Sequence, residues 1–105
     1  MSEYTGDIAK YTSNVNEAAV EGIVKHLGIA LRNKDSSLVS ATDPAELERL
    51  REGFVKKKLA RSESDADLDA AIASVMEKMK DERNKSRVTV CYLLAEHFGQ
   101  LGNFA

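Results

Sequence analysis

The most apolar stretch of the chain, Val88 to Phe98 (VTVCYLLAEHF), has apolar side chains around most of its circumference when drawn as a helix. At helical spacing, Cys91 and Ala95 share one face, and Val90 and Leu94 share another. A helix of this kind is buried by its neighbours. Its β-branched start would also suit a buried strand, but eleven residues is long for a strand. We therefore predict a central helix here.

Apolar residues recur at helical spacing in the segments before this run as well. The first of these segments, from about Glu3 to Thr12, is short and is weakened by Gly6. Three longer segments carry the inward stripes Val20/Ile23/Val24/Leu27, Leu47/Leu50/Phe54/Leu59 and Leu68/Ala71/Ile72/Val75/Met76/Met79.

Start and stop signals bound these segments. Asn16 and Ser64 stand where N-caps are expected, and Asp43 precedes a proline at the first helical position. Gly28 and Gly99 stand where a left-handed residue ends a helix. These signals predict helices starting near residues 17, 44 and 65.

The connections leave some alternatives open. Ile29 to Arg32 either extends the second helix or forms a separate turn, and the polar run 33–37 is typical of a loop. After it, Asp35 is expected to cap a single turn that carries Leu38 and Val39 inward. The tail residues Leu101 and Phe104 either fold back onto the chain or dock across a dimer, so the oligomeric state stays open.

Together these patterns predict one all-α domain spanning residues 1–105, a small bundle of four main helices plus a short extra helix or turn. Connections of about two to eight residues between helices are typical of sequential helices that pack as antiparallel neighbours. A chain of this length can bury a core without disulfides or metals. The C-terminal helix is expected at the centre.

The composition indicates the cellular compartment of the protein but not its partner. The net charge is -2, and the 30% of charged residues mix both signs, which is typical of solvated helix faces. Apolar runs fall well short of the ~20 residues that span a bilayer, so we expect no membrane segment. The single cysteine and the lack of a signal-peptide pattern at the N-terminus favour a cytoplasmic protein.

Asp65, Asp67 and Asp69 alternate as at the start of a calcium loop. Ala70, however, stands where that loop needs glycine, and Met76 stands where it needs a bidentate glutamate. We interpret the aspartates as carboxylates that favour a helix start, and we expect no metal.

The remaining chemically active side chains are few. Cys91 lies mid-helix on an apolar stripe, where nothing lowers a thiol pKa, so core packing is favoured over a thiol enzyme or redox sensor. His26 and His97 lie near the C-terminal ends of separate helices and share no metal-ligand spacing. No catalytic motif is present, so neither an enzyme nor a cofactor is expected.

The basic segment Arg83-Asn84-Lys85-Ser86-Arg87 lies at the predicted start of the last helix, where positive charge is unfavourable. Cations there oppose the helix dipole. They could form an anion site with the helix-start amides, widened by Lys78 and Lys80. Alternatively, Asp81, Glu82 or the aspartates of the fourth helix neutralise them, or the helix begins earlier. We favour this structural interpretation because acidic residues are plentiful nearby. The candidate anion-binding residues are Lys78, Lys80, Arg83, Lys85 and Arg87.

Several short helical motifs lie between about Gly28 and Phe98. They are Asn33-Lys34-Asp35-Ser36, Leu38-Val39-Ser40, Glu46-Leu47-Glu48 with Phe54 and Lys57-Lys58-Leu59, Leu68-Asp69-Ala70-Ala71-Ile72, and Arg83-Asn84-Lys85 leading to Tyr92-Leu93-Leu94. Together they resemble an uncharacterised bacterial family of small helical proteins, domain of unknown function 2853. The resemblance implies a small helical fold, and it implies no activity, cofactor or catalytic residue.

The leading functional hypothesis is therefore a small non-enzymatic interaction module with an unknown protein partner. The alternative is a phosphate or nucleic-acid binder that uses the basic start of the last helix, and it predicts steep salt dependence. The scarcity of aromatic residues, 6% of the chain, disfavours nucleic acid because few rings are available to stack on bases.

Overall fold

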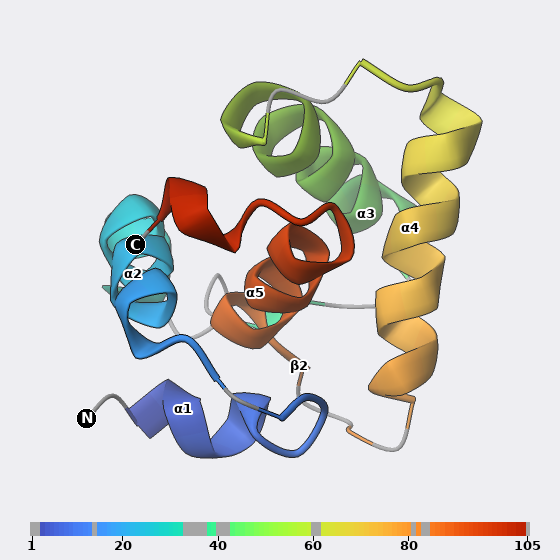
Figure 1. Ribbon diagram of the computed structural model, residues 1–105. Coiled ribbons are helices and arrows are strands. Elements are labelled where there is room, and N and C mark those ends of the chain that lie inside the picture. The colour runs from blue at the N-terminus through green and yellow to red at the C-terminus, as the bar shows by residue number, and fades with distance from the viewer. Residues whose placement is uncertain are drawn as a thin grey trace.

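A computed structural model describes residues 3–13, 15–32, 38–39, 43–59, 62–80, 82 and 85–104 (Figure 1). The elements in order are α1 (Glu3–Ile8), α2 (Glu17–Arg32), β1 (Leu38–Val39), α3 (Pro44–Arg49), η1 (Leu50–Lys58), α4 (Asp65–Lys78), β2 (Lys85–Ser86), α5 (Arg87–His97) and the 3₁₀-helix η2 (Leu101–Asn103). Helix α3 and the π-helix η1 follow one another directly as one longer helix. The predicted all-helical bundle is therefore confirmed, with a two-stranded sheet added to it.

Helix α5 lies at the centre of the bundle, as predicted (Figure 1). Every residue from Val88 to Ala95 is buried. Its neighbours are α1, α2, α4, both strands and η2. Among the described residues, none of the helices has the length and apolar character needed to cross a bilayer.

The three predicted N-caps are confirmed by hydrogen bonds. Each cap side chain accepts a bond from a backbone amide in the first turn of its helix, which satisfies a donor that the helix itself leaves unpaired. The bonds run from Ala19 N to Asn16 Oδ1 (3.1 Å), from Ala45 N to Asp43 Oδ1 (3.0 Å) and from Asp67 N to Ser64 Oγ (3.3 Å).

The π-helix η1 was not predicted. Its wider turn is closed at the end by a bond from Leu59 N to Phe54 O (3.0 Å), five residues apart. Phe54 and its neighbour Val55 are both buried, although the predicted stripe contained only Phe54. The π-helix therefore buries two adjacent side chains where the sequence pattern predicted one.

Several element boundaries differ from the predicted ones, and α1 ends at Ile8 rather than near Thr12. Helix α2 continues through Gly28 to Arg32, so Ile29 to Arg32 extend the second helix, which was one of the two predicted alternatives, and Gly28 is an exposed helical residue and not a stop signal. Leu38–Val39 form a strand and not a turn, because they pair antiparallel with Lys85–Ser86. That pairing joins segments far apart in sequence, which local patterns do not report. The predicted loop 33–37, with Asp35 as a cap, lies outside the described residues.

The tail folds back within the chain. Gly99, at φ +68°, ends α5 in the left-handed conformation that the sequence predicted. Phe104 is buried, and its ring stacks on Phe54 at 6.0 Å between centroids. The tail backbone also runs against α2 at Gly22, where the absence of a side chain permits the approach.

Two glycines of α2 provide a matched test of this contact. A Cβ at Gly22 would lie 2.0 Å from the Phe104 carbonyl oxygen, whereas a Cβ at Gly28 would meet nothing within 4 Å. We expect Gly22→Ala to lower the free energy of unfolding by about 1–3 kcal/mol because the tail must move away. Gly28→Ala should raise it by about 0.5–1 kcal/mol through helix propensity. Urea denaturation measures both, and equal midpoints for the two variants would contradict the tail packing.

Candidate functional site

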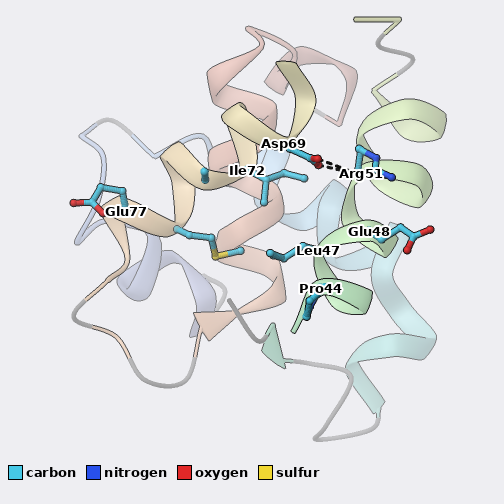
Figure 2. Close-up of a pocket in the computed structure, with 9 residues that line it drawn as sticks. Pro44, Leu47, Glu48, Arg51, Asp69, Ile72 and Glu77 are labelled. Atoms are coloured by element: carbon cyan, nitrogen blue, oxygen red, sulfur yellow. Dashed lines mark hydrogen bonds and ion pairs between the residues drawn. The ribbon is translucent and has the colours of Figure 1, made fainter. Parts of the chain in front are cut away.

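A groove with a volume of about 610 Å³ opens between α3 and α4. Figure 2 shows Leu47 and Ile72 between the two helices, with Arg51 beside Asp69 at one end. Along α3 and into η1 the wall residues are Pro44, Leu47, Glu48 and Arg51, and along α4 they are Asp69, Ile72, Ala73, Met76 and Glu77.

The wall residues follow helical spacing on both sides. Positions 44, 47, 48 and 51 form one stripe, and positions 69, 72, 73, 76 and 77 form the other. Each helix therefore presents one face to the groove. Leu47 and Met76 are half-buried and Ile72 is almost fully buried, so the floor is apolar and partly accessible.

The packing of α4 explains why the groove exists. Helix α4 packs against α5 and against η1, the second half of the long helix. The groove lies beside α3, the first half, where Leu47 and Met76 line the walls and stay half-exposed. The sequence analysis predicted that both residues face inward, and both do pack against the core while keeping part of their surface exposed. A signal in the sequence was Ala73, a small apolar residue beside the predicted stripe that widens the apolar face of α4.

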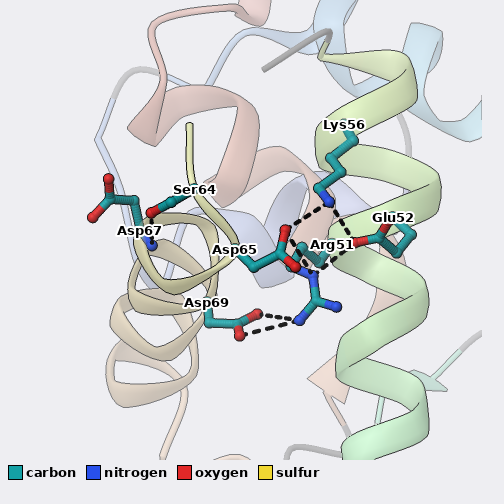
Figure 3. Close-up of polar contacts among 7 residues, drawn as sticks. All are labelled: Arg51, Glu52, Lys56, Ser64, Asp65, Asp67 and Asp69. Atoms are coloured by element: carbon teal, nitrogen blue, oxygen red, sulfur yellow. Dashed lines mark hydrogen bonds and ion pairs between the residues drawn. The ribbon is translucent and has the colours of Figure 1, made fainter. Parts of the chain in front are cut away.

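A network of charges closes one end of the groove (Figure 3). Arg51 Nη1 donates to both carboxylate oxygens of Asp69 at 3.1 Å, and Arg51 Nε donates to Glu52 at 2.8 Å. Lys56 Nζ lies 2.8 Å from Glu52 and 2.6 Å from Asp65. Two cations thus share three carboxylates.

These contacts favour the charged forms of the network. Hydrogen bonds to Glu52 and then Asp69 raise the pKa of the Arg51 guanidinium above its ordinary value. Hydrogen bonds from Lys56 and then Arg51 lower the pKa of the Glu52 carboxyl, and the bond from Lys56 lowers that of Asp65. At neutral pH Arg51 therefore stays charged, and the carboxylates beside it balance its charge within the protein.

The other two carboxylates at the rim, Glu48 and Glu77, do not belong to the network around Arg51. Glu48 is exposed, and in the described part of the chain it has no ion pair. Glu77 pairs with Lys80 at 3.3 Å, but the side chains of Lys80 and Glu77 are 65% and 73% exposed, so this pair contributes little energy. Figure 2 shows Glu48 and Glu77 extending from opposite sides of the groove.

The three alternating aspartates fall at the start of α4, as the sequence predicted. Asp65 and Asp69 pair with cations of η1, and the Asp67 amide bonds to the Ser64 cap. Within the described ranges, no three His, Cys, Asp or Glu side chains gather in a way that could hold a metal ion.

The candidate anion-binding residues are distributed over several elements. Lys78 ends α4 and Lys80 lies in the turn that follows, and both are exposed. Lys85 is buried in β2, where its Nζ donates to the Glu82 carbonyl oxygen at 2.7 Å. Arg87 pairs with Glu46 of α3 and donates to the Leu38 carbonyl oxygen at 3.4 Å. Arg83 lies outside the described residues.

This arrangement differs from the sequence interpretation in two ways. Helix α5 begins at Arg87, after a strand, so Lys85 is not part of its first turn. The carboxylate that pairs with Arg87 belongs to Glu46 of α3, whereas the sequence analysis looked for it near residue 82 and in the fourth helix. Glu46 was missed because the pair joins residues 41 positions apart.

The thiol and both imidazoles lie away from the groove lining. Cys91 is fully buried, and burial raises the pKa of its thiol to about 12 against a smaller opposing effect of Arg87. His26 contacts the rings of Phe54 and Phe104, and partial burial, followed by the charge of Lys58, lowers its pKa. The His97 ring packs edge-on against Phe98.

The comparison with models of protein families identifies a family. The model of the family described as "Protein of unknown function (DUF2853)" matches residues 3–102 of the 105-residue chain. The match extends beyond the segment from Gly28 to Phe98 on which the sequence resemblance rested. No curated protein matches the chain.

The buried thiol gives a prediction that separates core packing from a reactive cysteine. At about pH 8 the Cys91 thiol is neutral and covered, so iodoacetamide should not modify the native protein on the timescale on which free cysteine reacts. The same protein unfolded in urea should react fully, which serves as the control. Fast modification of the native protein, followed by mass spectrometry, would contradict the packing of α5.

Proposed function

The chain belongs to the family described as a protein of unknown function (DUF2853), and this membership supplies no function. From the geometry of the structure, we propose that the protein is a small non-enzymatic interaction module. The observation that carries this proposal is the groove between α3 and α4, which we propose as the binding surface for a protein partner. We also propose a bacterial setting, as the resemblance to the family implies, and a cytoplasmic one, because a single buried thiol suits a reducing compartment.

The shape and lining of the groove support a binding role. Its volume of about 610 Å³ lies in the usual range of ligand sites, roughly 300–1,000 Å³. Accessible apolar surface rimmed by polar side chains is typical of interaction sites. Met76 adds a flexible thioether, a side chain that adapts to different partner surfaces.

The chemistry of the lining supports binding over catalysis. Arg51, at the rim of the groove, donates hydrogen bonds to carboxylates of the protein, so its charge is already paired within the chain. The thiol and the two imidazoles, the side chains best suited to nucleophilic or acid–base steps, do not line the groove.

Ala73 and Ser74 offer a matched test of the groove. Both are small, exposed residues of α4 and adjacent in sequence, but only Ala73 lines the groove. A photo-crosslinking amino acid at position 73, introduced in the native host, should give a discrete adduct with another polypeptide. The same group at position 74 should give none, because that side chain points away from the groove.

A second variant shows whether the adduct depends on the apolar floor. Met76→Glu places a charge among the apolar side chains, and we expect it to reduce the adduct from position 73 strongly. Circular dichroism checks that the half-buried substitution leaves the helices intact. Equal crosslinking from positions 73 and 74, or none from either, would contradict the proposal.

The alternative function, phosphate or nucleic-acid binding through Lys78, Lys80, Arg83, Lys85 and Arg87, makes a different prediction. Exposure of Lys78 and Lys80 supports it, whereas the internal contacts of Lys85 and Arg87 weigh against it. It predicts localised, saturable amide shifts at residues 85–87 on adding inorganic phosphate or a short mixed RNA, and these should weaken steeply with salt. The interaction-module proposal predicts no such shifts.

A further inference from the structure

The walls of the groove define what shape of partner fits. Two helical stripes, one on each wall, border an apolar floor formed by Leu47, Ile72 and Met76. A surface made by two neighbouring helices accepts the side-chain ridges of another helix more readily than an extended strand, because it offers no unpaired backbone groups. A helix in a groove is read through apolar anchors about one turn apart.

The charges around the groove indicate which charged side chains a partner should carry beside its apolar surface. The Arg51–Asp69 pair neutralises one end. The carboxylates that remain available are Glu48 on the α3 side and Glu77 on the α4 side, and they extend from opposite sides of the floor (Figure 2). Glu77 keeps only an exposed pair with Lys80, which a better-placed cation can replace.

This arrangement matches that of a helix–helix interface. In such interfaces an apolar seam is flanked on both sides by charged positions that choose the partner. Here both flanks carry carboxylates, so lysine or arginine on both sides of an apolar stripe would be attracted, and glutamate or aspartate would be repelled.

We propose that the groove binds one amphipathic helix of a partner protein whose apolar stripe is flanked on both sides by lysine or arginine. This inference rests on the proposed function and specifies the partner's chemistry. The apolar stripe covers Leu47 and Met76, and the flanking cations pair with Glu48 and Glu77.

A displayed library of helical peptides tests the charge rule directly. Leucine is fixed along one helical stripe, and the positions on each side of it vary between lysine and glutamate. Four baits are used, namely the wild-type protein, a Glu48→Lys/Glu77→Lys double variant, Ala73→Gln and Ser74→Gln. All four altered positions are exposed, so the fold should be retained.

We expect wild type to enrich lysine-flanked over glutamate-flanked peptides by about tenfold at low salt, with a smaller ratio at high salt. The double variant should reverse the preference. Ala73→Gln narrows the groove and should reduce recovery by about tenfold, whereas Ser74→Gln should match wild type.

The proposal is overturned if wild type prefers glutamate or shows no charge preference, if the double variant keeps the wild-type preference, or if Ala73→Gln recovers as many peptides as Ser74→Gln. The crosslinking experiment distinguishes this failure from that of the proposed function. A specific adduct at position 73 together with a failed charge rule would leave the groove as an interface for a partner of other chemistry.

Discussion

Burial of α5 on every side is the constraint on which the rest of the structure depends. Its apolar side chains supply the centre of the core, but its polar groups also leave water and each needs a partner. Those partners come from α1, from the connection that follows it and from α3, so α5 holds these segments together. The bonds join Arg87 to Glu46, Thr89 to Asp7, the Asn16 amide to the Tyr92 hydroxyl, and Thr12 to Glu96.

The same constraint positions the groove. Glu46 turns inward to meet Arg87, and on a helix this orientation directs the next residues, Leu47 and Glu48, to the side and outward. One turn of α3 therefore contributes a buried ion pair, part of an apolar floor and a rim carboxylate. Helix α4 packs on α5 and η1 and is held to η1 by Arg51 and Lys56, which leaves the α3 side open.

Much of the fold could be predicted because its signals are local. Caps at Asn16, Asp43 and Ser64 bond within their own first turns, and Gly99 needs only its own conformational freedom. The candidate groove could not be predicted in this way. The stripes that contain Leu47 and Met76 show that both are apolar, but whether a neighbour covers them depends on how the helices pack.

The sequence by itself determined the all-helical class, the central place of Val88 to Ala95, the starts of α2, α3 and α4 and the end of α5, since hydrophobic period and capping act over a few residues. Only the tertiary structure decided the β1–β2 pairing, the partner of Arg87 and the opening beside α3. Each of these depends on residues about 25 to 50 positions apart, which meet only after the chain has packed around α5.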